Sequence, residues 1–152
     1  MLIRNMMLND YEAVDKLMQQ LHNLHVEGRP DLYVALEHPY SETEFKEKVE
    51  SDDYISILAE EDDMVIGICF VKMKKRSMMV NMPTAYMDDL CVAKAMLRKG
   101  VATKLYREAE KRAKELGAKR MDLMVWGFNE EAIAFYKSLG MKEQRYIFEK
   151  EL

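Results

Sequence analysis

The sequence predicts an α+β or α/β fold built around one mixed sheet, and three observations lead to it. The chain has 152 residues, 49% hydrophobic and 33% charged, which suits one buried core and argues against a disordered chain. Apolar residues alternate in some segments and recur at helical spacing in others. In the second half these segments follow the order strand, helix, strand, helix, which favours a parallel strand pair with a right-handed crossover. We expect a single domain over residues 1–152.

The first third of the chain is predicted to hold an edge strand and two helices. A short apolar run over 2–6 indicates the strand. The pair Asn9–Asp10 offers N-caps for a helix that runs to about Val26, with apolar residues on one face. Ser41 followed by Glu44 is a capping-box pattern, which predicts that a short second helix begins there.

The middle of the chain is predicted to be a run of strands. Residues 54–59 and 64–73 are rich in β-branched and aromatic residues and flank the acidic turn 60–63. A third apolar run covers 79–92. We therefore expect a hairpin followed by a third strand.

The second half alternates between helices and strands. Apolar spacing predicts a helix over 101–116 and a strand over 121–126. A second helix is expected to begin at Asn129, which is a favourable N-cap, and to end at Gly140. The remaining residues, 141–152, indicate one or two closing strands.

Composition excludes several classes of protein. The longest apolar run, 65–71, is far too short to span a membrane, and the net charge of −4 gives no signal for nucleic-acid binding. Cys69 and Cys91 lie in apolar stretches, which is typical of buried reduced thiols and of a cytoplasmic protein. His22 and His25 share a helix face, but no further residues complete a metal-ligand set, so we expect no metal.

Charge is distributed unevenly along the chain. Residues 31–63 contain 12 acidic residues and two lysines, whereas residues 94–120 contain ten basic and three acidic residues. One segment would favour a cationic ligand and the other an anionic ligand. The alternative is that both are solvated helical faces that only provide solubility.

A basic, glycine-containing segment joins the third strand to the helix that follows it. Gly100 and Ala102 are small enough to let a ligand's phosphates approach the backbone, and Arg98, Lys99 and Thr103 add hydrogen-bond donors. Unpaired N–H groups at a helix N-terminus bind anions. The segment therefore meets the requirements for a pyrophosphate site, although a glycine at such a junction is also common as turn geometry alone.

This segment resembles the pyrophosphate loop of the GNAT superfamily of acetyl-CoA-dependent N-acetyltransferases. Gly100 and Ala102 match its small residues, whereas Leu97 stands where the family has Arg or Gln. Residues 129–141 are similar to a second signature of the family. Its matching positions are Asn129, Ala132, Phe135, Tyr136, Leu139 and Gly140. The resemblance covers about 64–152 well and the first third only in layout.

The resemblance implies an α+β GNAT fold with a mixed central sheet of about six or seven strands flanked by about four helices. It implies transfer of an acetyl group from acetyl-CoA to a primary amine, by direct attack in a ternary complex and without a metal. The acceptor would be a small molecule or a peptide. A homodimer, formed through the C-terminal strand or the helical edge, is a further expectation.

The resemblance also implies which residues contact the cofactor. The backbone of the strand end would pair with the pantetheine arm, the loop and helix start would hold the pyrophosphate, and the second signature would supply the remaining contacts. These residues are Leu90, Cys91, Val92, Arg98, Lys99, Gly100, Val101, Ala102, Thr103, Asn129, Ala132 and Tyr136.

Tyr136 matches the tyrosine that protonates the departing thiolate in this family. A phenol of pKa about 10 gives its proton to a thiolate of pKa about 8.5 in a step that is uphill by about 2 kcal/mol. That cost is small beside a typical barrier, so the general-acid role is chemically reasonable. The alternative is that Tyr136 is only a core residue of its helix.

Asp88 is the first candidate for the general base, because a primary amine must lose a proton before it attacks. The stretch resembles the diamine acetyltransferase branch, which has an acidic residue at this place. Strand alternation would put Asp88 on the side of Leu90 and Asp89 on the opposite side, unless a bulge intervenes. Alternatively Asp88 is a solvated carboxylate. Glu37 and His38, in the loop after the first helix, are secondary candidates for the acceptor site.

Two other functions remain open from the sequence alone. One is a regulatory module that binds CoA without catalysis, which Leu97 in place of the polar residue would favour. The other is a protein N-terminal or lysine acetyltransferase, because the acidic loop region could serve a peptide as well as a small molecule.

Overall fold

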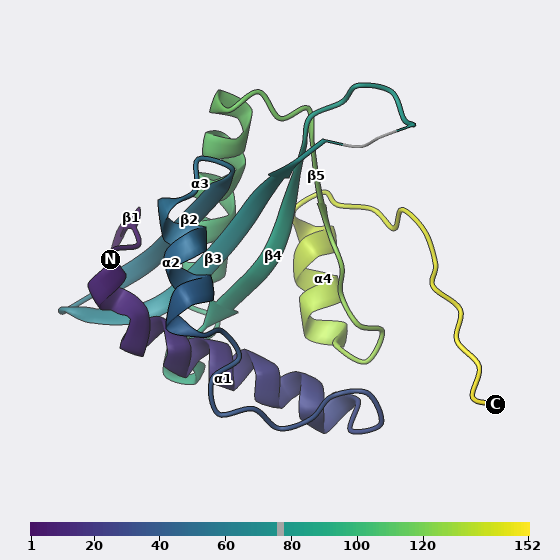
Figure 1. The fold of residues 1–152 in the computed structure, drawn as a ribbon, viewed down its shortest axis with the longest axis horizontal. Helices are drawn as coiled ribbons and strands as arrows, with labels where there is room; N and C mark the ends of the chain where they lie inside the picture. Colours follow the sequence, from purple (N-terminus) through teal and green to yellow (C-terminus); the bar gives the residue numbers. More distant parts are fainter. Residues whose placement is uncertain (76–77) are drawn as a thin grey trace.

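The computed structural model describes residues 1–75 and 78–152, which fold around one five-stranded sheet (Figure 1). The strands lie side by side in chain order: β1 (Leu2–Asn5), β2 (Tyr54–Glu61), β3 (Met64–Lys74), β4 (Thr84–Val92) and β5 (Arg120–Leu123). β1 to β4 are antiparallel to their neighbours, and β5 runs parallel to β4. The predicted α+β class and mixed sheet are thus confirmed.

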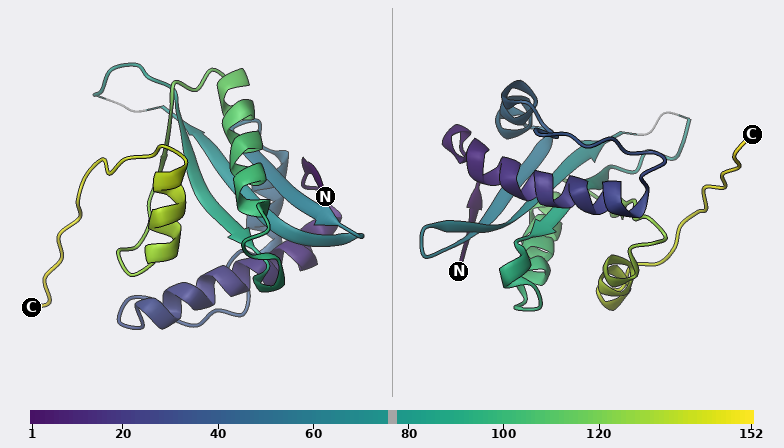
Figure 2. Two further views of the ribbon diagram at one scale, coloured as in Figure 1. Left: turned by 180° about the vertical axis from the view of Figure 1, so that it is seen from behind. Right: turned by 90° about the horizontal axis from the view of Figure 1, so that it is seen from below.

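Helices cover both faces of the sheet (Figure 2). α1 (Tyr11–Gly28) and α2 (Glu42–Glu50) lie on one face, and α3 (Val101–Glu115) and α4 (Glu130–Ser138) lie on the other. Two short 3₁₀ turns, η1 (Leu8–Asp10) and η2 (Lys94–Met96), precede α1 and α3. Among the residues that the structure describes, no helix is long and apolar enough to cross a membrane.

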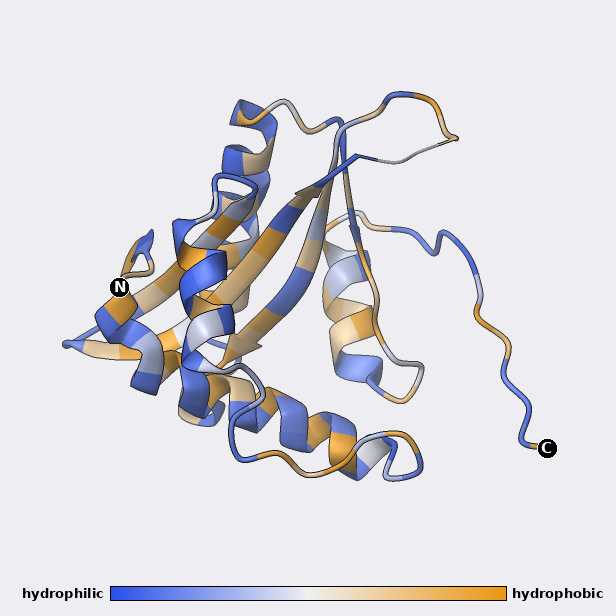
Figure 3. Cartoon of the chain, in the orientation of Figure 1, coloured by the Kyte–Doolittle hydropathy of each residue, from blue (hydrophilic) through white to orange (hydrophobic). Residues whose placement is uncertain are grey.

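The central strand β3 is buried on both faces, which explains its nearly continuous apolar sequence. Ile68 and Phe70 pack with α1 and α2, whereas Cys69 and Val71 pack on the α3 side. Figure 3 shows hydrophobic residues concentrated along the strands, with hydrophilic residues interspersed on the helices. Gly67 allows α3 to approach closely, because a Cβ there would lie 2.9 Å from Leu105 Cδ1.

Two predicted helix starts are confirmed by their capping hydrogen bonds. The Glu44 N–H donates to Ser41 Oγ at 3.1 Å, and the Ser41 N–H donates to the Glu44 carboxylate at 2.8 Å, which completes the capping box of α2. The Ala132 N–H donates to Asn129 Oδ1 at 3.2 Å and caps α4. These starts were predictable because each depends on residues within one helical turn.

Some predicted boundaries differ from the structure. β4 begins at 84 rather than 79 and β5 ends at 123 rather than 126. Residues 141–152 contain no strand, so the sheet has five strands instead of six or seven. The Asp10 side chain does not cap α1, because its carboxylate binds the Arg4 guanidinium at 2.8 and 2.9 Å.

Candidate active site

The second half of β4 has an open edge. β5 pairs with β4 only over 84–87, and in the described chain no strand pairs with the β5-facing edge of residues 88–92. Figure 1 shows the two strands diverging toward the C-terminal end of β4. Backbone N–H and C=O groups on such an edge can pair with an extended ligand that carries amides.

The end of this open segment is held by α1. Gln20 Nε2 donates to the Val92 carbonyl at 2.9 Å, and the Lys94 N–H donates to Gln20 Oε1 at 3.2 Å. Gln20 therefore fixes both the last residue of β4 and the start of the loop that follows. A backbone hydrogen bond from the Ala93 N–H to the Ile66 carbonyl at 2.9 Å also holds the chain where it passes from the strand into the predicted pyrophosphate loop.

The loop before α3 has the backbone of an anion site. Gly100 has φ of +80° and is the N-cap of α3, and Arg98 also has a positive φ of +61°. The first N–H groups of a helix have no partner within the helix, and the helix dipole makes this end positive. The predicted residues Arg98, Lys99 and Thr103 are all exposed around it. Leu97 is exposed as well and offers no polar group.

The second family-like signature lies beside this loop. Arg98 approaches Glu131 of α4, with 3.5 Å between the guanidinium and the carboxylate, so the start of α4 and the loop are neighbours. The Asn129 side chain and the Ala132 N–H are hydrogen-bonded to each other. Asn129 therefore acts first as a helix cap, and any contact with a ligand must use its remaining groups.

A β-bulge changes where the two central carboxylates point. Phe70 of β3 pairs with Asp89, but Val71 pairs with Met87, so Asp88 is an extra residue without an opposite partner on β3. Both Asp88 and Asp89 contact groups on the α1–α2 face of the sheet. The bulge, which the sequence analysis named as the exception, thus places both side chains on one face, whereas simple alternation would put them on opposite faces.

Asp89 is bonded to a tyrosine that the sequence analysis did not single out. The Tyr40 hydroxyl donates to Asp89 Oδ2 at 2.6 Å across the α1–α2 face. Burial raises the pKa of the Asp89 carboxyl, and this hydrogen bond opposes the rise. Burial also raises the pKa of Tyr40, so its hydroxyl keeps its proton and remains a donor.

Asp88 faces an ammonium group from α2. Lys48 Nζ lies 3.5 Å from Asp88 Oδ2 and donates to the Tyr54 hydroxyl at 3.2 Å. It also lies 4.7 Å from the centre of the Tyr40 ring and 4.5 Å from that of Tyr54, within cation–π distance. The Lys48 side chain is only 13% exposed. A carboxylate and aromatic rings thus already hold one primary ammonium group.

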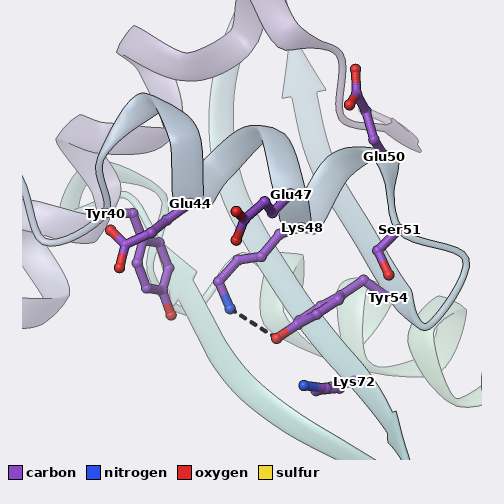
Figure 4. Close-up of a pocket in the computed structure, with 8 residues that line it drawn as sticks. All are labelled: Tyr40, Glu44, Glu47, Lys48, Glu50, Ser51, Tyr54 and Lys72. Carbon is purple, nitrogen blue, oxygen red and sulfur yellow. Dashed lines mark hydrogen bonds between the residues drawn. The ribbon is translucent and has the colours of Figure 1, made fainter.

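This ammonium site lies at a cavity of about 650 Å³ (Figure 4). Glu44 and Glu47 of α2 lie near Lys48, whereas Glu50 lies at the far end of the helix, and the aromatic rings lie on either side of the ammonium group. The lining residues are Tyr40, Glu44, Glu47, Lys48, Glu50, Ser51, Tyr54 and Lys72. Three of the twelve acidic residues of 31–63 therefore line this cavity together with two lysines, a small excess of negative charge that favours a cationic ligand.

Tyr136 lies on the other side of β4. It is half-buried on α4 and packs against the cluster formed by α3 and the sheet. Burial raises the pKa of its phenol, and Cys69, Tyr106 and Asp89 raise it further. Within the described chain its hydroxyl has no hydrogen-bond partner. The phenol is therefore protonated at neutral pH and has a proton available for a ligand.

The two secondary acceptor candidates lie outside the cavity. Glu37 and His38 are exposed in the loop between α1 and α2, and neither lines the pocket beside Lys48. His38 Nδ1 bonds Asp15 Oδ2 at 2.8 Å, and this hydrogen bond raises the pKa of His38. They belong to the α1–α2 loop rather than to the group around Asp88.

The other side chains that the sequence analysis considered, His22, His25 and Cys91, have contacts outside this site. His22 Nε2 bonds the Val34 carbonyl at 2.7 Å, and His25 stacks on Tyr33 with 5.2 Å between ring centres. Over residues 1–75 and 78–152, no three His, Cys, Asp or Glu residues are grouped to hold a metal. Burial raises the pKa of Cys91 to about 12, so its thiol is protonated at neutral pH.

Tyr40, Lys48 and Asp89 are the site residues that sequence reasoning missed. Tyr40 and Asp89 are separated by 49 residues, and only the folded sheet brings them together. Their chemistry is visible in the sequence, but their proximity is not. Two adjacent aspartates inside an apolar strand are the one local signal in the sequence, and the bulge determines on which face of the sheet their side chains lie.

Solved structures with a similar fold were found over the whole chain. A single-site mutant of the BH1408 protein from Bacillus halodurans is 26% identical, with a TM-score of 0.96, and the match covers 100% of this chain and 99% of that one. The aminoglycoside N-acetyltransferase AAC(6')-Iy, in complex with CoA, is 19% identical with a TM-score of 0.75, covering 99% and 98%. The aminoglycoside 6'-N-acetyltransferase AAC(6')-IG from Acinetobacter haemolyticus is 21% identical with a TM-score of 0.74, covering 100% and 99%.

A search of curated proteins gave no match. Residues 18–141, most of the chain, match the model of the acetyltransferase (GNAT) family. The matched range contains the open strand edge, the loop before α3 and the start of α4, which are the elements that the two sequence signatures singled out. This chain therefore belongs to the acetyltransferase (GNAT) family.

Proposed function

We propose that the protein transfers the acetyl group of acetyl-CoA to a primary amine, by direct attack while both substrates are bound. The observation that carries this proposal is the position of the β4 bulge. It lies beside an open strand edge, with the carboxylates of Asp88 and Asp89 on one face of the sheet and the Tyr136 phenol on the other. A base and an acid are thus available on the two sides of one strand.

The residues fit acetyl-CoA in two respects. The free edge of β4 over 90–92 offers backbone groups to the amides of pantetheine, apart from the Val92 carbonyl that Gln20 already uses. The N-terminus of α3, with the N–H groups of Val101 to Thr103 and the side chains of Arg98 and Lys99, suits a diphosphate. The co-substrate would supply the activated acetyl group. These backbone groups and basic side chains would hold its pantetheine and diphosphate parts.

Asp88 and Tyr136, which lie on the two sides of β4, would carry out the two proton transfers. Asp88 would accept the proton that the amine must lose, because its part-buried carboxylate lies 3.5 Å from the ammonium group of Lys48, a residue that lines the cavity. The amine nitrogen then bonds to the acetyl carbon as the carbon–sulfur bond breaks. Tyr136 would give its proton to the departing sulfur: burial keeps its phenol protonated at neutral pH, and the same rise in pKa makes the phenol a weaker acid, so the transfer relies on a hydrogen bond to the developing thiolate.

The cavity favours a cationic acceptor. Glu44, Glu47 and Glu50 line it, and the site around Lys48 demonstrates that carboxylate and aromatic groups there can enclose a primary ammonium group. Similar structures include AAC(6')-Iy with a bisubstrate analog, CoA-S-monomethyl-acetylneamine, which supports an amine acceptor. We propose a small molecule as the acceptor, with a peptide amine as the alternative. Glu37 and His38, exposed in the α1–α2 loop, are not among the residues that line the cavity.

We place the reaction in the cytoplasm as part of the same proposal. Cys69 and Cys91 are both unpaired and buried, which is common in a reducing compartment.

Thioester consumption with a panel of primary amines tests the reaction. We expect the parent protein to consume acetyl-CoA and to form the acetylated amine, identified by mass spectrometry. Tyr136→Phe should lower turnover about 100-fold, since a general acid typically contributes that much, while the Kd for acetyl-CoA changes only a few-fold. No turnover with any amine or peptide, despite CoA binding, would instead indicate a regulatory module. Unchanged turnover in Tyr136→Phe would remove this residue from the mechanism.

Removal of each carboxylate tests the base. We expect Asp88→Asn to lower kcat/KM at least about 100-fold at neutral pH, because the amide cannot accept the proton of the amine. The matched variant Asp89→Asn retains an oxygen for Tyr40 and should change kcat/KM only a few-fold. A loss of this size in Asp89→Asn alone would assign the base to Asp89 instead.

The charge of Lys48 should limit binding of a cationic acceptor. Lys48→Met keeps the apolar stem and removes one positive charge beside Asp88, so the KM for a cationic amine should fall about fivefold, equivalent to about 1 kcal/mol. The KM for acetyl-CoA should not change. Lys46→Met, an exposed position on the same helix, is the control. A KM that rises or stays constant in Lys48→Met would contradict a cationic acceptor in this cavity.

A further inference from the structure

Lys48 is a primary amine that the proposed reaction does not use. Its side chain is only 13% exposed, whereas Lys46 on the same helix is exposed to solvent. Figure 4 shows its ammonium group lying between the rings of Tyr40 and Tyr54 rather than in solvent. Lysine is rarely enclosed in this way, because removing its charge from water is costly. The position of this amine therefore depends on what surrounds it.

The groups around the Lys48 nitrogen are one carboxylate and three aromatic rings. The nitrogen lies 3.5 Å from Asp88 Oδ2 and donates a hydrogen bond to the Tyr54 hydroxyl at 3.2 Å. The ring centres of Tyr40, Tyr54 and Phe70 lie 4.7, 4.5 and 5.7 Å from it. Aromatic faces attract a cation without binding its protons. The nitrogen is thus held beside the carboxylate without a short ion pair.

This nitrogen lies where the proposed mechanism needs an acceptor nitrogen. A general base takes a proton over hydrogen-bond distance or through one water. An acceptor amine must therefore come about as near to Asp88 as the Lys48 nitrogen already is. Lys48 is itself an alkyl amine, the same chemical class as the proposed acceptor. The chain thus carries its own candidate acceptor beside the proposed base.

The same place is where the open edge of β4 begins. The pairing of β4 with β5 ends at Met87, so Asp88 is the first residue of the free segment proposed for the pantetheine arm. Tyr136, the proposed acid, packs on the opposite side of this strand. An amine, a base and an acid are therefore arranged around one short segment of backbone.

We propose that the protein acetylates its own Lys48 when acetyl-CoA is bound and no acceptor is present, an inference that rests on the proposed acetyl transfer. The ammonium group gives one proton to Asp88, and the neutral nitrogen bonds to the acetyl carbon as the carbon–sulfur bond breaks. Tyr136 protonates the departing sulfur, and the second proton that the nitrogen loses restores Tyr136 through solvent. Asp88 releases its proton to solvent, so the products are acetyl-lysine, CoA and one proton.

Acetylation of Lys48 changes how the cavity receives an acceptor. Acetyl-lysine keeps one N–H for the Tyr54 hydroxyl but has no charge, so it no longer pairs with Asp88. The carboxylate is then free to bind an incoming ammonium group. The cavity keeps its glutamates and loses one of its two lysine charges. The modification therefore strengthens binding of a cationic acceptor.

Peptide mass spectrometry of the full chain, after incubation with acetyl-CoA and no amine, tests the proposal. We expect one acetyl group per chain, on Lys48. Lys46 is exposed on the same helix, and Lys72 lines the same cavity but makes no ion pair in the described part of the chain. Both lysines should stay unmodified. Tyr136→Phe leaves the surroundings of Lys48 intact and should slow the modification at least about 100-fold, because it removes the acid.

A kinetic comparison tests the effect on binding. Preincubation of the parent with acetyl-CoA should lower the KM for a cationic amine, measured from initial rates, about fivefold. Lys48→Arg keeps a positive charge and cannot be acetylated at this position, since its guanidinium stays protonated. Its KM should not respond to the preincubation. A response in Lys48→Arg equal to that of the parent would contradict a role for Lys48.

The outcomes separate this inference from the proposed function. Acetylation of added amines without modification of Lys48 would overturn self-acetylation and leave the proposed function intact. Modification of Lys46 as fast as Lys48 would overturn it too, because acetyl-CoA would then be reacting chemically with any lysine. Acetylation of neither the amines nor Lys48, although CoA binds, would overturn both.

Discussion

The arrangement of the site depends on one interruption of strand pairing. β4 separates from β5 after Met87 and gains an extra residue at Asp88, so its last five residues have a free edge and altered side-chain directions. Gly67 lets α3 pack closely against the neighbouring strand, and Gln20 holds the end of β4 from the opposite face. The open edge is thus fixed by packing on both sides, and the residues proposed for chemistry are arranged around it.

This geometry provides separate regions for the anionic co-substrate and the cationic acceptor of the proposed reaction. The N-terminus of α3 and the basic residues of its loop lie at one end of the open edge, where an anionic group is favoured. The glutamates of α2 surround the cavity on the α1–α2 face, where a cation is favoured. Part of the uneven charge of the sequence, three glutamates of α2 and the basic residues Arg98 and Lys99, therefore lies in these two regions of the structure.

Local signals predicted much of the fold. The capping box of Ser41 and the cap of Asn129 were predictable because their partners lie within three residues, and the αL conformation at Gly100 suits a glycine at a helix start. Features that depend on distant residues were not predictable. The bulge at Asp88 depends on how β4 pairs with β3. The contacts of Lys48 with Tyr40 and Tyr54 form only when α2 packs on the sheet. Residues 141–152 have strand-like composition but pair with no strand among the residues that the structure describes, so composition alone predicted the wrong element.

Amide hydrogen exchange with and without CoA is the most direct test of the open edge. If pantetheine adds to β4 and the diphosphate binds the start of α3, saturating CoA should slow exchange in residues 88–92 and 101–103 and leave β1 unchanged. Unchanged exchange in both segments at saturating CoA, or slowing confined to another part of the molecule, would contradict this account of the site.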